Sequence, residues 1–221
     1  MTPRDEASDD LLAEQRAYYD ALAAHYLDGA IPGSEQAGDE LVAAIDAFAP
    51  AGDVLELACG PGTWTPHLLR HASTVTAVDS SPRMLELAAS VPGTTAVRFQ
   101  RDDLFTWRPD RRYDVVFFGF WLSHVPRERF ADFWSRVADA LVPGGRVLFV
   151  DDAYRTPDEL VQGEESTTIR RRLRDGTAYR AVKVPHEPAA LSRQLADLGW
   201  DVRVEQTNGP FYWGAGRRAD R

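Results

Sequence analysis

Two closely spaced glycines and a carboxylate further along the chain are the residues best suited to chemistry. Gly60 and Gly62 stand in the segment 53–64, which reads Asp-Val-Leu-Glu-Leu-Ala-Cys-Gly-Pro-Gly-Thr-Trp. A glycine turn lets the backbone approach a ligand more closely than a Cβ would permit. The helix expected after it offers unpaired N–H groups and a partial positive charge. Asp79 ends a second apolar run, where a carboxylate can accept hydrogen bonds from both hydroxyls of a ribose. These residues predict a cradle for a small molecule.

A cationic segment is the second candidate for binding chemistry. Residues 169–184 read Ile-Arg-Arg-Arg-Leu-Arg-Asp-Gly-Thr-Ala-Tyr-Arg-Ala-Val-Lys-Val, and Asp175-Gly176 between two alternating runs predicts a β-hairpin. Arginine binds phosphonate or carboxylate through two parallel hydrogen bonds, so these cations could hold an anionic substrate at the rim of a pocket. Alternatively the hairpin is simply solvated, and its arginines pair with acids such as Glu164 and Glu165.

His124 is the candidate general base. It lies in the segment Phe-Trp-Leu-Ser-His-Val-Pro, residues 120–126, directly after an apolar run. An imidazole has an unperturbed pKa of about 6.5, so it can take a proton from a hydroxyl or an amine near neutral pH. It could equally orient the loop or hydrogen-bond the acceptor without moving a proton. The other histidines, His25, His67, His71 and His186, are expected to be surface or packing residues.

The elements that must position these residues alternate between strand and helix. Apolar runs predict strands at 54–57, 74–79, 96–100, 113–119, 146–150, 200–205 and 211–214. Helical spacing predicts helices at 9–26, 36–48, 129–141 and 188–198, and one after the glycine turn that includes Ala72. A further helix begins at Pro82 with Ser80 or Ser81 as its cap. Such alternation favours an α/β fold, a single-domain, Rossmann-like, doubly wound and mostly parallel seven-stranded sheet.

The whole chain, 1–221, is interpreted as one domain with two additions. Residues 1–50 are expected to form an N-terminal helical lid, with a loop at Pro32-Gly33, and residues 153–186 an inserted segment that carries the basic hairpin. A chain of 221 residues with 44% hydrophobic residues can bury one substantial core. The residues from Gly216 to Arg221 are expected to be frayed.

The glycine turn resembles a known cofactor motif. A dinucleotide fingerprint needs a third glycine, and here that position is Thr65, which argues against a nicotinamide or flavin site. The stretch from Val54 to Gly62 instead resembles motif I of the class I S-adenosylmethionine-dependent methyltransferases. The resemblance covers nearly the whole chain. It implies S-adenosyl-L-methionine as cofactor, S-adenosyl-L-homocysteine as product, and no metal.

The same resemblance implies which residues bind the cofactor. Glu56 and the glycine turn would hold the methionine end, Asp79 the ribose, and Asp103, in preference to Asp102, the adenine amino group. Tyr18 and Tyr26 would reach the pocket from the lid helix. The full set of expected cofactor ligands is Tyr18, Glu56, Ala58, Cys59, Gly60, Gly62, Trp64, Asp79, Ser80, Met84, Asp103, Leu104 and Gly119.

A closer likeness is to the dehydrophos-type phosphonate O-methyltransferases. It rests on Phe117-Phe118, Trp121-Leu-Ser-His-Val-Pro126, Phe130, Phe133-Trp134, Ile169-Arg-Arg to Lys183-Val and Leu198-Gly-Trp200. It implies that Arg171 and Lys183 hold the substrate's oxyanion, with Trp121 and Tyr26 also contacting substrate. On a two-residue hairpin Arg171 and Lys183 would face opposite ways. Either a bulge intervenes, or the two residues serve different sites, for instance across a homodimer.

Charge and composition exclude several classes of function. A net charge of −9 argues against a nucleic-acid partner, and no apolar run is long enough to span a membrane. The single cysteine, Cys59, excludes an internal disulfide and fits a reducing cytoplasm. No Cys/His cluster has the spacing of a metal site.

The sequence therefore predicts a cytoplasmic enzyme of secondary metabolism that methylates a phosphonate or carboxylate oxygen of a small anionic metabolite. An alternative within the class is methylation of a hydroxyl or an amine, with His124 as base. From a different class, the chain could be an NAD-dependent oxidoreductase or a cofactor-binding module without activity.

Overall fold

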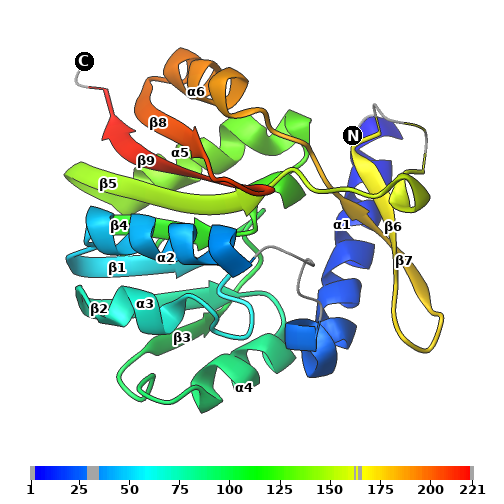
Figure 1. The fold of residues 1–221 in the computed structure, drawn as a ribbon, viewed down its shortest axis with the longest axis horizontal. Coiled ribbons are helices and arrows are strands. Elements are labelled where there is room, and N and C mark those ends of the chain that lie inside the picture. Colours follow the sequence, from blue (N-terminus) through cyan, green and yellow to red (C-terminus); the bar gives the residue numbers. More distant parts are fainter. Residues whose placement is uncertain (1–2, 29–34, 162, 164–165, 220–221) are drawn as a thin grey trace.

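Seven strands form one sheet in the order β3-β2-β1-β4-β5-β9-β8 (Figure 1). Their bounds are β1 (Gly52–Leu57), β2 (Ala72–Asp79), β3 (Arg98–Arg101), β4 (Tyr113–Gly119), β5 (Leu141–Asp152), β8 (Trp200–Gln206) and β9 (Phe211–Arg218). Strands β1 to β5 pair in parallel, whereas β9 runs antiparallel to both β5 and β8. The computed structural model describes residues 3–28, 35–161, 163 and 166–219. The mostly parallel, doubly wound α/β sheet predicted from the sequence is confirmed.

The strand order reverses at β1, which pairs with β2 on one side and with β4 on the other. In open α/β sheets, ligands bind outside the carboxyl ends of the strands at such a reversal. The glycine turn follows β1 and the His124 segment follows β4, so the topology alone brings these two candidate regions to the same edge of the sheet.

Helices cover both faces of the sheet, as Figure 1 shows. The helices α2 (Glu35–Phe48) and α3 (Thr65–Leu69) pack on one face, and α5 (Phe130–Ala140) and α6 (Pro188–Asp197) on the other. Helix α4 (Pro82–Ser90) contacts β2 and β3. Because successive strand residues point to opposite faces, Phe117 joins the apolar cluster under α2, while Phe118 joins the cluster under α5.

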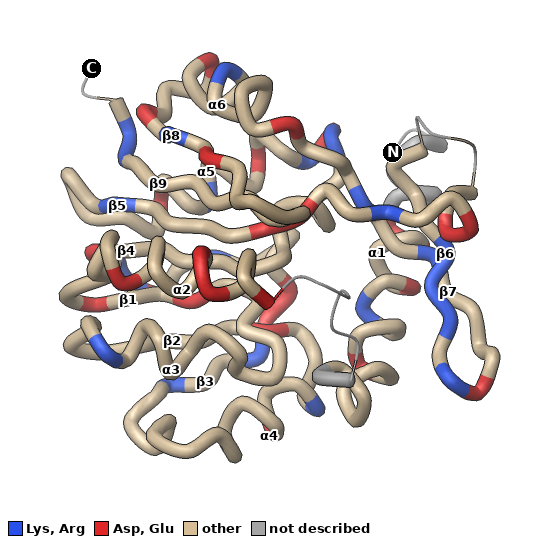
Figure 2. The backbone as a smooth tube through the Cα atoms, viewed as in Figure 1, with Lys and Arg blue, Asp and Glu red and all other residues tan. Residues whose placement is uncertain are grey.

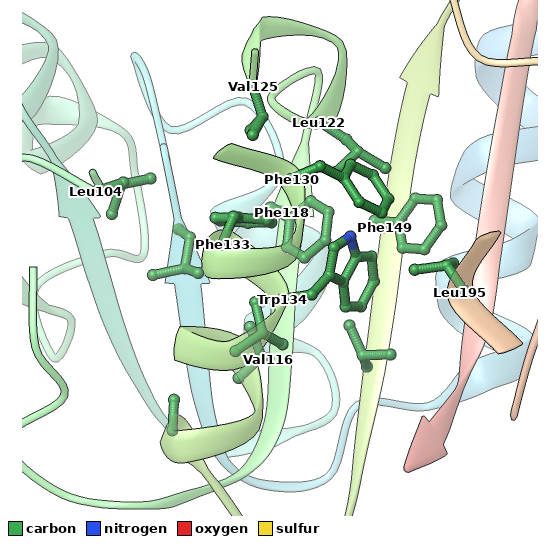
Figure 3. Close-up of a cluster of buried hydrophobic side chains, with 14 of the residues drawn as sticks. Leu104, Val116, Phe118, Leu122, Val125, Phe130, Phe133, Trp134, Phe149 and Leu195 are labelled. Carbon is green, nitrogen blue, oxygen red and sulfur yellow. The ribbon is translucent and has the colours of Figure 1, made fainter. Parts of the chain in front are cut away.

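Aromatic rings fill the core beneath α5 and α6 (Figure 3). The Phe118 and Phe149 rings stack with their centroids 5.3 Å apart, and the Trp134 ring meets both edge-on at 5.8 Å. Trp134 also meets Trp200 edge-on at 4.9 Å. Such offset and edge-on pairs add to the stability that area burial gives. This packing fixes the end of β4, from which the His124 segment leaves.

The N-terminal helix α1 (Pro3–Leu22) lies beyond the carboxyl ends of the strands, between the sheet and a separate two-stranded hairpin (Figure 1). The hairpin consists of β6 (Thr168–Arg172) and β7 (Ala178–Val182), and its strands are rich in cations (Figure 2). Short 3-10 helices complete the fold: η1 (Ala23–Asp28), η2 (Leu122–His124), η3 (Arg127–Arg129) and η4 (Pro157–Glu159). No helix in the described ranges is long and apolar enough to cross a bilayer.

The structure differs from the expected elements at several ends. Helix α3 stops at Leu69, and Ala72 already belongs to β2. Strand β5 begins at Leu141, directly after α5. The expected fraying from Gly216 is wrong as far as Arg218, because β9 continues to that residue. Gly216 pairs with both neighbouring strands, and a Cβ there would lie 1.9 Å from the Asp201 carbonyl oxygen, so only glycine fits.

Some predictions lie outside the described residues. These are the Pro32-Gly33 loop, the proposed ion-pair partners Glu164 and Glu165, and the last two residues of the expected tail.

Candidate active site

The turn after β1 presents backbone groups to a cavity. Ala58 and Gly60 both adopt positive φ, at 52° and 54°. The Gly60 N–H donates to Asp79 Oδ2 over 2.9 Å, which ties the turn to the end of β2. A positive φ costs energy for alanine, and backbone strain of this kind occurs at functional sites more often than elsewhere. The strain at Ala58 thus marks this turn as a candidate binding element.

Glu56 lies beneath this turn and is buried. Its Oε2 accepts a 2.7 Å hydrogen bond from Thr65 Oγ1, whereas its Oε1 has no hydrogen-bond partner among the described residues. Burial raises the pKa of Glu56 to about 8. Glu56 does not line either of the cavities described below. It can therefore support the turn from below. Since its carboxyl holds a proton at neutral pH and Oε2 accepts from Thr65, the buried Oε1 can carry that proton.

The end of β2 organises the next part of the site. Asp79 Oδ1 accepts a hydrogen bond from the Ser81 N–H at 2.9 Å. Of the two serines predicted to cap α4, Ser81 is the cap: its Oγ accepts from the Met84 N–H at 3.1 Å. Ser80 instead lines a cavity with Asp79 and Met84.

A small cavity of about 70 Å³ lies over the ends of β1 to β4. Asp103 and Leu104, which follow β3, line it, whereas Asp102 does not. Asp103 Oδ2 accepts from Arg16 Nη1 at 3.0 Å, and its Oδ1 accepts from the Phe105 N–H at 3.0 Å. The expected cofactor ligands in this wall are Ala58, Gly60, Asp79, Ser80, Met84, Asp103, Leu104 and Gly119. Trp121, expected to contact substrate, lines the same cavity.

A much larger cavity, about 900 Å³, opens between the sheet, α1 and the hairpin. Its walls bring together other predicted site residues: Tyr18, Tyr26, Cys59, Trp64, His124, Arg171 and Lys183. His25, expected to be a surface or packing residue, lines it as well. Gly62 lines neither cavity, because it packs against α4.

The two cavities meet at a set of shared wall residues. These are Tyr19, Tyr26, Ala58, Gly60, Gly119, Phe120 and His124, and they are called the junction below. Gly119 is required there, because a Cβ would lie 2.5 Å from Trp64 Nε1. Phe120 has a φ of 54°, so the chain bends sharply at the end of β4, as it does at the end of β1. A group bound in one cavity can therefore reach a group bound in the other at the junction.

His124 is buried and held through both ring nitrogens. Nδ1 lies 2.6 Å from the Val182 carbonyl oxygen, and Nε2 lies 2.8 Å from the Tyr19 hydroxyl. Burial lowers the pKa of His124 well below 6.5, and the nearby Lys183 ammonium lowers it further. The imidazole is thus neutral at pH 7, but its basic nitrogen is already engaged by Tyr19.

Lys183 is buried in a network with two aspartates. Its Nζ lies 3.0 Å from Ser123 Oγ, 2.9 Å from Asp152 Oδ1 and 3.9 Å from Asp151 Oδ1. Burial raises the pKa of Asp151 to about 6, against the opposing effect of Lys183. An ammonium has three N–H donors. Ser123 and Asp152 accept two of them among the described residues, which leaves a donor for the larger cavity that Lys183 lines.

Arg171 lies on the same side of the hairpin as Lys183. Arg171 pairs with Tyr179 in the ladder, and residues 173–177 connect the strands, so the two-residue turn expected at Asp175-Gly176 is wrong. The Lys183 N–H donates to the Thr167 carbonyl at 2.8 Å and continues the ladder. Thr167 and Arg171 are an even number of residues apart, so Arg171 and Lys183 share a face. The guanidinium also forms an ion pair with Glu159.

Sequence reasoning missed three residues that the fold brings to the site. Tyr19 and Asp152 line the cavities. Gln15 is buried beside them, where its Oε1 accepts from the Val182 N–H at 2.8 Å. The sequence does hold a signal for Gln15: it is a polar residue on the helix face that otherwise carries Leu11 and Leu22. Tyr19 could not be told from its neighbour Tyr18 by spacing alone.

The polar groups that line the small cavity fit a nucleoside cofactor with a charged tail. Asp79 and Asp103 offer carboxylates in the small cavity, and Gly60 leaves open space where a Cβ would stand. Trp121 Nε1 is a buried donor without a hydrogen-bond partner among the described residues. In the same described ranges, no group of three or more His, Cys, Asp or Glu side chains could hold a metal ion.

Comparison with known proteins agrees with this site. A family model described as a methyltransferase domain matches residues 54–145. Trans-aconitate 2-methyltransferase of Streptomyces avermitilis is 31% identical over 161 residues, which cover 70% of this chain and 59% of that protein. The enzyme of that name from Mycobacterium tuberculosis (strain H37Ra) is 30% identical over 164 residues, covering 70% of this chain and 58% of that protein. The chain thus matches less than two thirds of the length of these relatives.

Solved structures match over almost the whole chain. A DhpI-SAH complex superimposes with a TM-score of 0.85 at 39% identity, and the match covers 96% of this chain and 98% of that one. A DhpI-SAM-HEP complex gives the same TM-score at 40% identity, covering 94% and 97%. These matches exclude the NAD-dependent oxidoreductase interpretation and identify S-adenosylmethionine as the cofactor. The chain belongs to the class I S-adenosylmethionine-dependent methyltransferases.

Proposed function

We propose that the protein transfers the methyl group of S-adenosylmethionine to an ionised oxygen, carboxylate or phosphonate, of a small anionic metabolite in secondary metabolism. One observation carries the proposal: Arg171 and Lys183 share a face and line the larger cavity, which meets the small cavity at the junction. An oxyanion held by these two cations would lie on the substrate side of the transferred methyl.

The chemistry needs alignment more than proton transfer. The methyl group sits on a sulfonium cation, and the acceptor oxygen displaces it in line while the two charges neutralise each other. An ionised acceptor is already a nucleophile, so no base is required. The enzyme then gains most by holding the two reactants in line and by excluding water that solvates the separated charges. Helix α1, which covers the strand ends, is suited to exclude that water.

The site roles follow from this assignment. Asp79 would hold the ribose, Asp103 and Leu104 the adenine, and the turn at 58–60 the methionine end. Trp121 and Tyr26 would contact substrate near the junction. Residues 1–50 would act as the lid and 153–186 as the substrate-side insertion. Cytoplasmic location and a homodimer remain predictions.

The relatives support an anionic acceptor. Two of them carry the name trans-aconitate 2-methyltransferase, and a structural neighbour is a complex of DhpI with SAM and HEP. The larger cavity continues along the hairpin, where Arg172 at the end of β6 and Arg174 and Asp175 in the turn also line it, with two cations against one acid. Added cations there favour an acceptor with negative charge over a neutral one.

The second candidate is methylation of a hydroxyl or an amine. It is favoured by Asp152, whose carboxylate lines the larger cavity beside its ion-pair partner Lys183 and could accept a hydrogen bond from a hydroxyl or an amine. His124 was the expected base for that reaction. Its Nε2 is engaged by Tyr19, so it could serve as base only after that hydrogen bond is broken or through the tyrosine hydroxyl.

An acceptor screen tests the proposal. Purified protein is incubated with methyl-labelled S-adenosylmethionine and matched sets of carboxylates, phosphonates, phenols and amines. We expect methyl transfer to carboxylates or phosphonates, with turnover that does not fall when the acceptor is fully ionised. Transfer only to phenols or amines would reject the proposal in favour of the second candidate. Binding of cofactor without transfer to any class would leave the cofactor-binding module.

A further inference from the structure

Tyr19 and His124 form a hydrogen-bonded pair at the junction of the two cavities. The Tyr19 hydroxyl lies 2.8 Å from His124 Nε2, and the two rings meet edge-on with centroids 5.3 Å apart. Both residues line both cavities. The pair therefore stands where cofactor and acceptor must meet.

The direction of each hydrogen bond follows from the chemistry of the partners. The Val182 carbonyl can only accept, so His124 Nδ1 carries the hydrogen that it donates over 2.6 Å. A neutral imidazole protonated at Nδ1 has a lone pair at Nε2. Burial raises the pKa of the Tyr19 phenol well above 10, so the hydroxyl keeps its proton and donates it to that lone pair. The Tyr19 oxygen can then offer only lone pairs to the junction.

A tyrosine oxygen in this state is a poor ligand for an anionic acceptor, because its single proton is committed to His124. It is a good partner for a sulfonium methyl group, whose hydrogens are polarised by the positive sulfur. The donors for the oxyanion come instead from Arg171 and Lys183 on the hairpin side. Tyr19 on α1 thus attracts the methyl group, whereas Arg171 and Lys183 on the hairpin side attract the acceptor.

We propose that Tyr19 is a catalytic residue of the methyl transfer and that His124 is its positioning residue. The Tyr19 oxygen accepts C–H hydrogen bonds from the methyl group and directs it toward the acceptor. The carbon–sulfur bond breaks as the carbon–oxygen bond forms; the sulfur keeps the electrons of the broken bond and the acceptor oxygen supplies the new pair. Neither Tyr19 nor His124 gains or loses a proton. The inference rests on the proposed methyl transfer.

The surrounding contacts hold the pair in this arrangement. Gln15, one turn before Tyr19 on α1, donates to the His124 carbonyl at 3.4 Å and accepts from the Val182 N–H at 2.8 Å. Gln15 therefore links α1, η2 and β7, the same three elements that the Tyr19–His124–Val182 hydrogen bonds connect. Tyr18 packs edge-on against the Tyr19 ring at 5.0 Å.

A double-mutant cycle tests the proposal. Tyr19→Phe, His124→Ala and the double variant are assayed for kcat, for both KM values and for S-adenosylhomocysteine binding by calorimetry. We expect each single variant to lower kcat by about five- to fiftyfold, because C–H contacts and methyl alignment are both lost. Both KM values should change by less than about threefold, since binding is left to other residues. The double variant should be no slower than the slower single variant, because His124 acts only through Tyr19.

Two further variants keep the test decisive. Tyr179→Phe is the matched control, since Tyr179 packs against Tyr18 but lines neither cavity, and it should keep full kcat. His124→Gln can accept the tyrosine proton and donate to Val182, so it should restore most of the activity that His124→Ala loses. If His124→Ala fails to fold, His124→Gln still tests whether His124 acts by positioning Tyr19.

Three results would overturn the inference: full kcat in Tyr19→Phe, multiplicative losses in the double variant, or His124→Gln as slow as His124→Ala. The mutant cycle and the acceptor screen can fail independently of each other. If the wild type methylates only phenols or amines, the anionic-acceptor proposal fails, and the cycle is run on the acceptor that is used.

Discussion

Gly60 and Gly62 stand two residues apart in the turn after β1 but have opposite surroundings. Gly60 lines both cavities, and a Cβ built on it would have nothing within 4 Å. A Cβ on Gly62 would lie 3.0 Å from Ala88 Cα in α4. The first glycine therefore leaves space for a ligand, and the second lets a helix pack close to the turn.

This contrast predicts different defects for the two alanine variants. Gly60→Ala should weaken S-adenosylhomocysteine binding at least tenfold, and should cost only about 1–2 kcal/mol of stability for its positive φ. Gly62→Ala should lose about 2–4 kcal/mol, because the clash with α4 adds to its own positive φ. Thermal unfolding and calorimetry measure the two effects. The reverse order, with Gly62→Ala the weaker binder and Gly60→Ala the less stable, would contradict the assignment.

Arg171→Ala should raise KM for the acceptor about tenfold or more while leaving cofactor binding nearly unchanged. The reason is that Arg171 lines the larger cavity, which Lys183 lines from the same face of the hairpin. Arg170→Ala is the matched control, because the neighbouring residue in β6 points to the opposite, exposed face. Steady-state kinetics at fixed ionic strength separates them. Equal effects of the two substitutions would mean that general hairpin charge, and not a bound oxyanion, is responsible.

Glu56 should make stability fall as the pH rises from 6.5 to 8. Its folded pKa is about 8, above its ordinary 4.5, so in this window the folded state holds a proton that the unfolded state has lost. The stabilisation is thus present at low pH and disappears as the pH passes the folded pKa. The loss amounts to about 2 kcal/mol across the window.

Glu56→Gln removes this titration and keeps a similar shape, so its stability should be nearly flat over the same range. Urea unfolding at several pH values measures both proteins. The window lies above Asp151, whose pKa is about 6. The buried His186 and His124 have lowered pKa values, so at the lower end of the window they add a small rise of stability with pH, which both proteins share. The same slope in both proteins would show that another group is responsible.

Gln15→Met should loosen α1 from the hairpin. The substitution conserves volume but leaves the buried Val182 N–H without its acceptor, at a cost of about 1–3 kcal/mol. We expect faster hydrogen exchange in both α1 and β7 and weaker cofactor binding. Ala17→Met, on the exposed side of the same helix, is the control and should change neither. Faster exchange in α1 alone would show that Gln15 does not connect the two elements.

The sequence by itself determined the sheet and which loops meet at the candidate cofactor site, because their signals are local. Alternating and unbroken apolar runs placed the strands, and Pro82 preceded by two candidate cap serines placed the start of α4, whereas the structure chose Ser81 as the cap. The carboxyl ends of parallel strands meet at one edge of the sheet, so Asp79, at the end of β2, and Asp103, two residues past β3, had to lie at the same edge. The ends of elements were less certain, since Ala72 and Gly216 take their structure from neighbouring strands.

Only the tertiary structure decided the substrate side. The register of β6 and β7 depends on the residues at their turn, and a shift of one position moves every side chain to the other face. That register places Arg171 and Lys183 on the same face of the hairpin. The state of His124 depends on Tyr19, which is 105 residues away in the chain, and on the carbonyl of Val182. No periodicity within a segment encodes a hydrogen bond between segments, so the role of this histidine became visible only when α1, η2 and β7 were packed together.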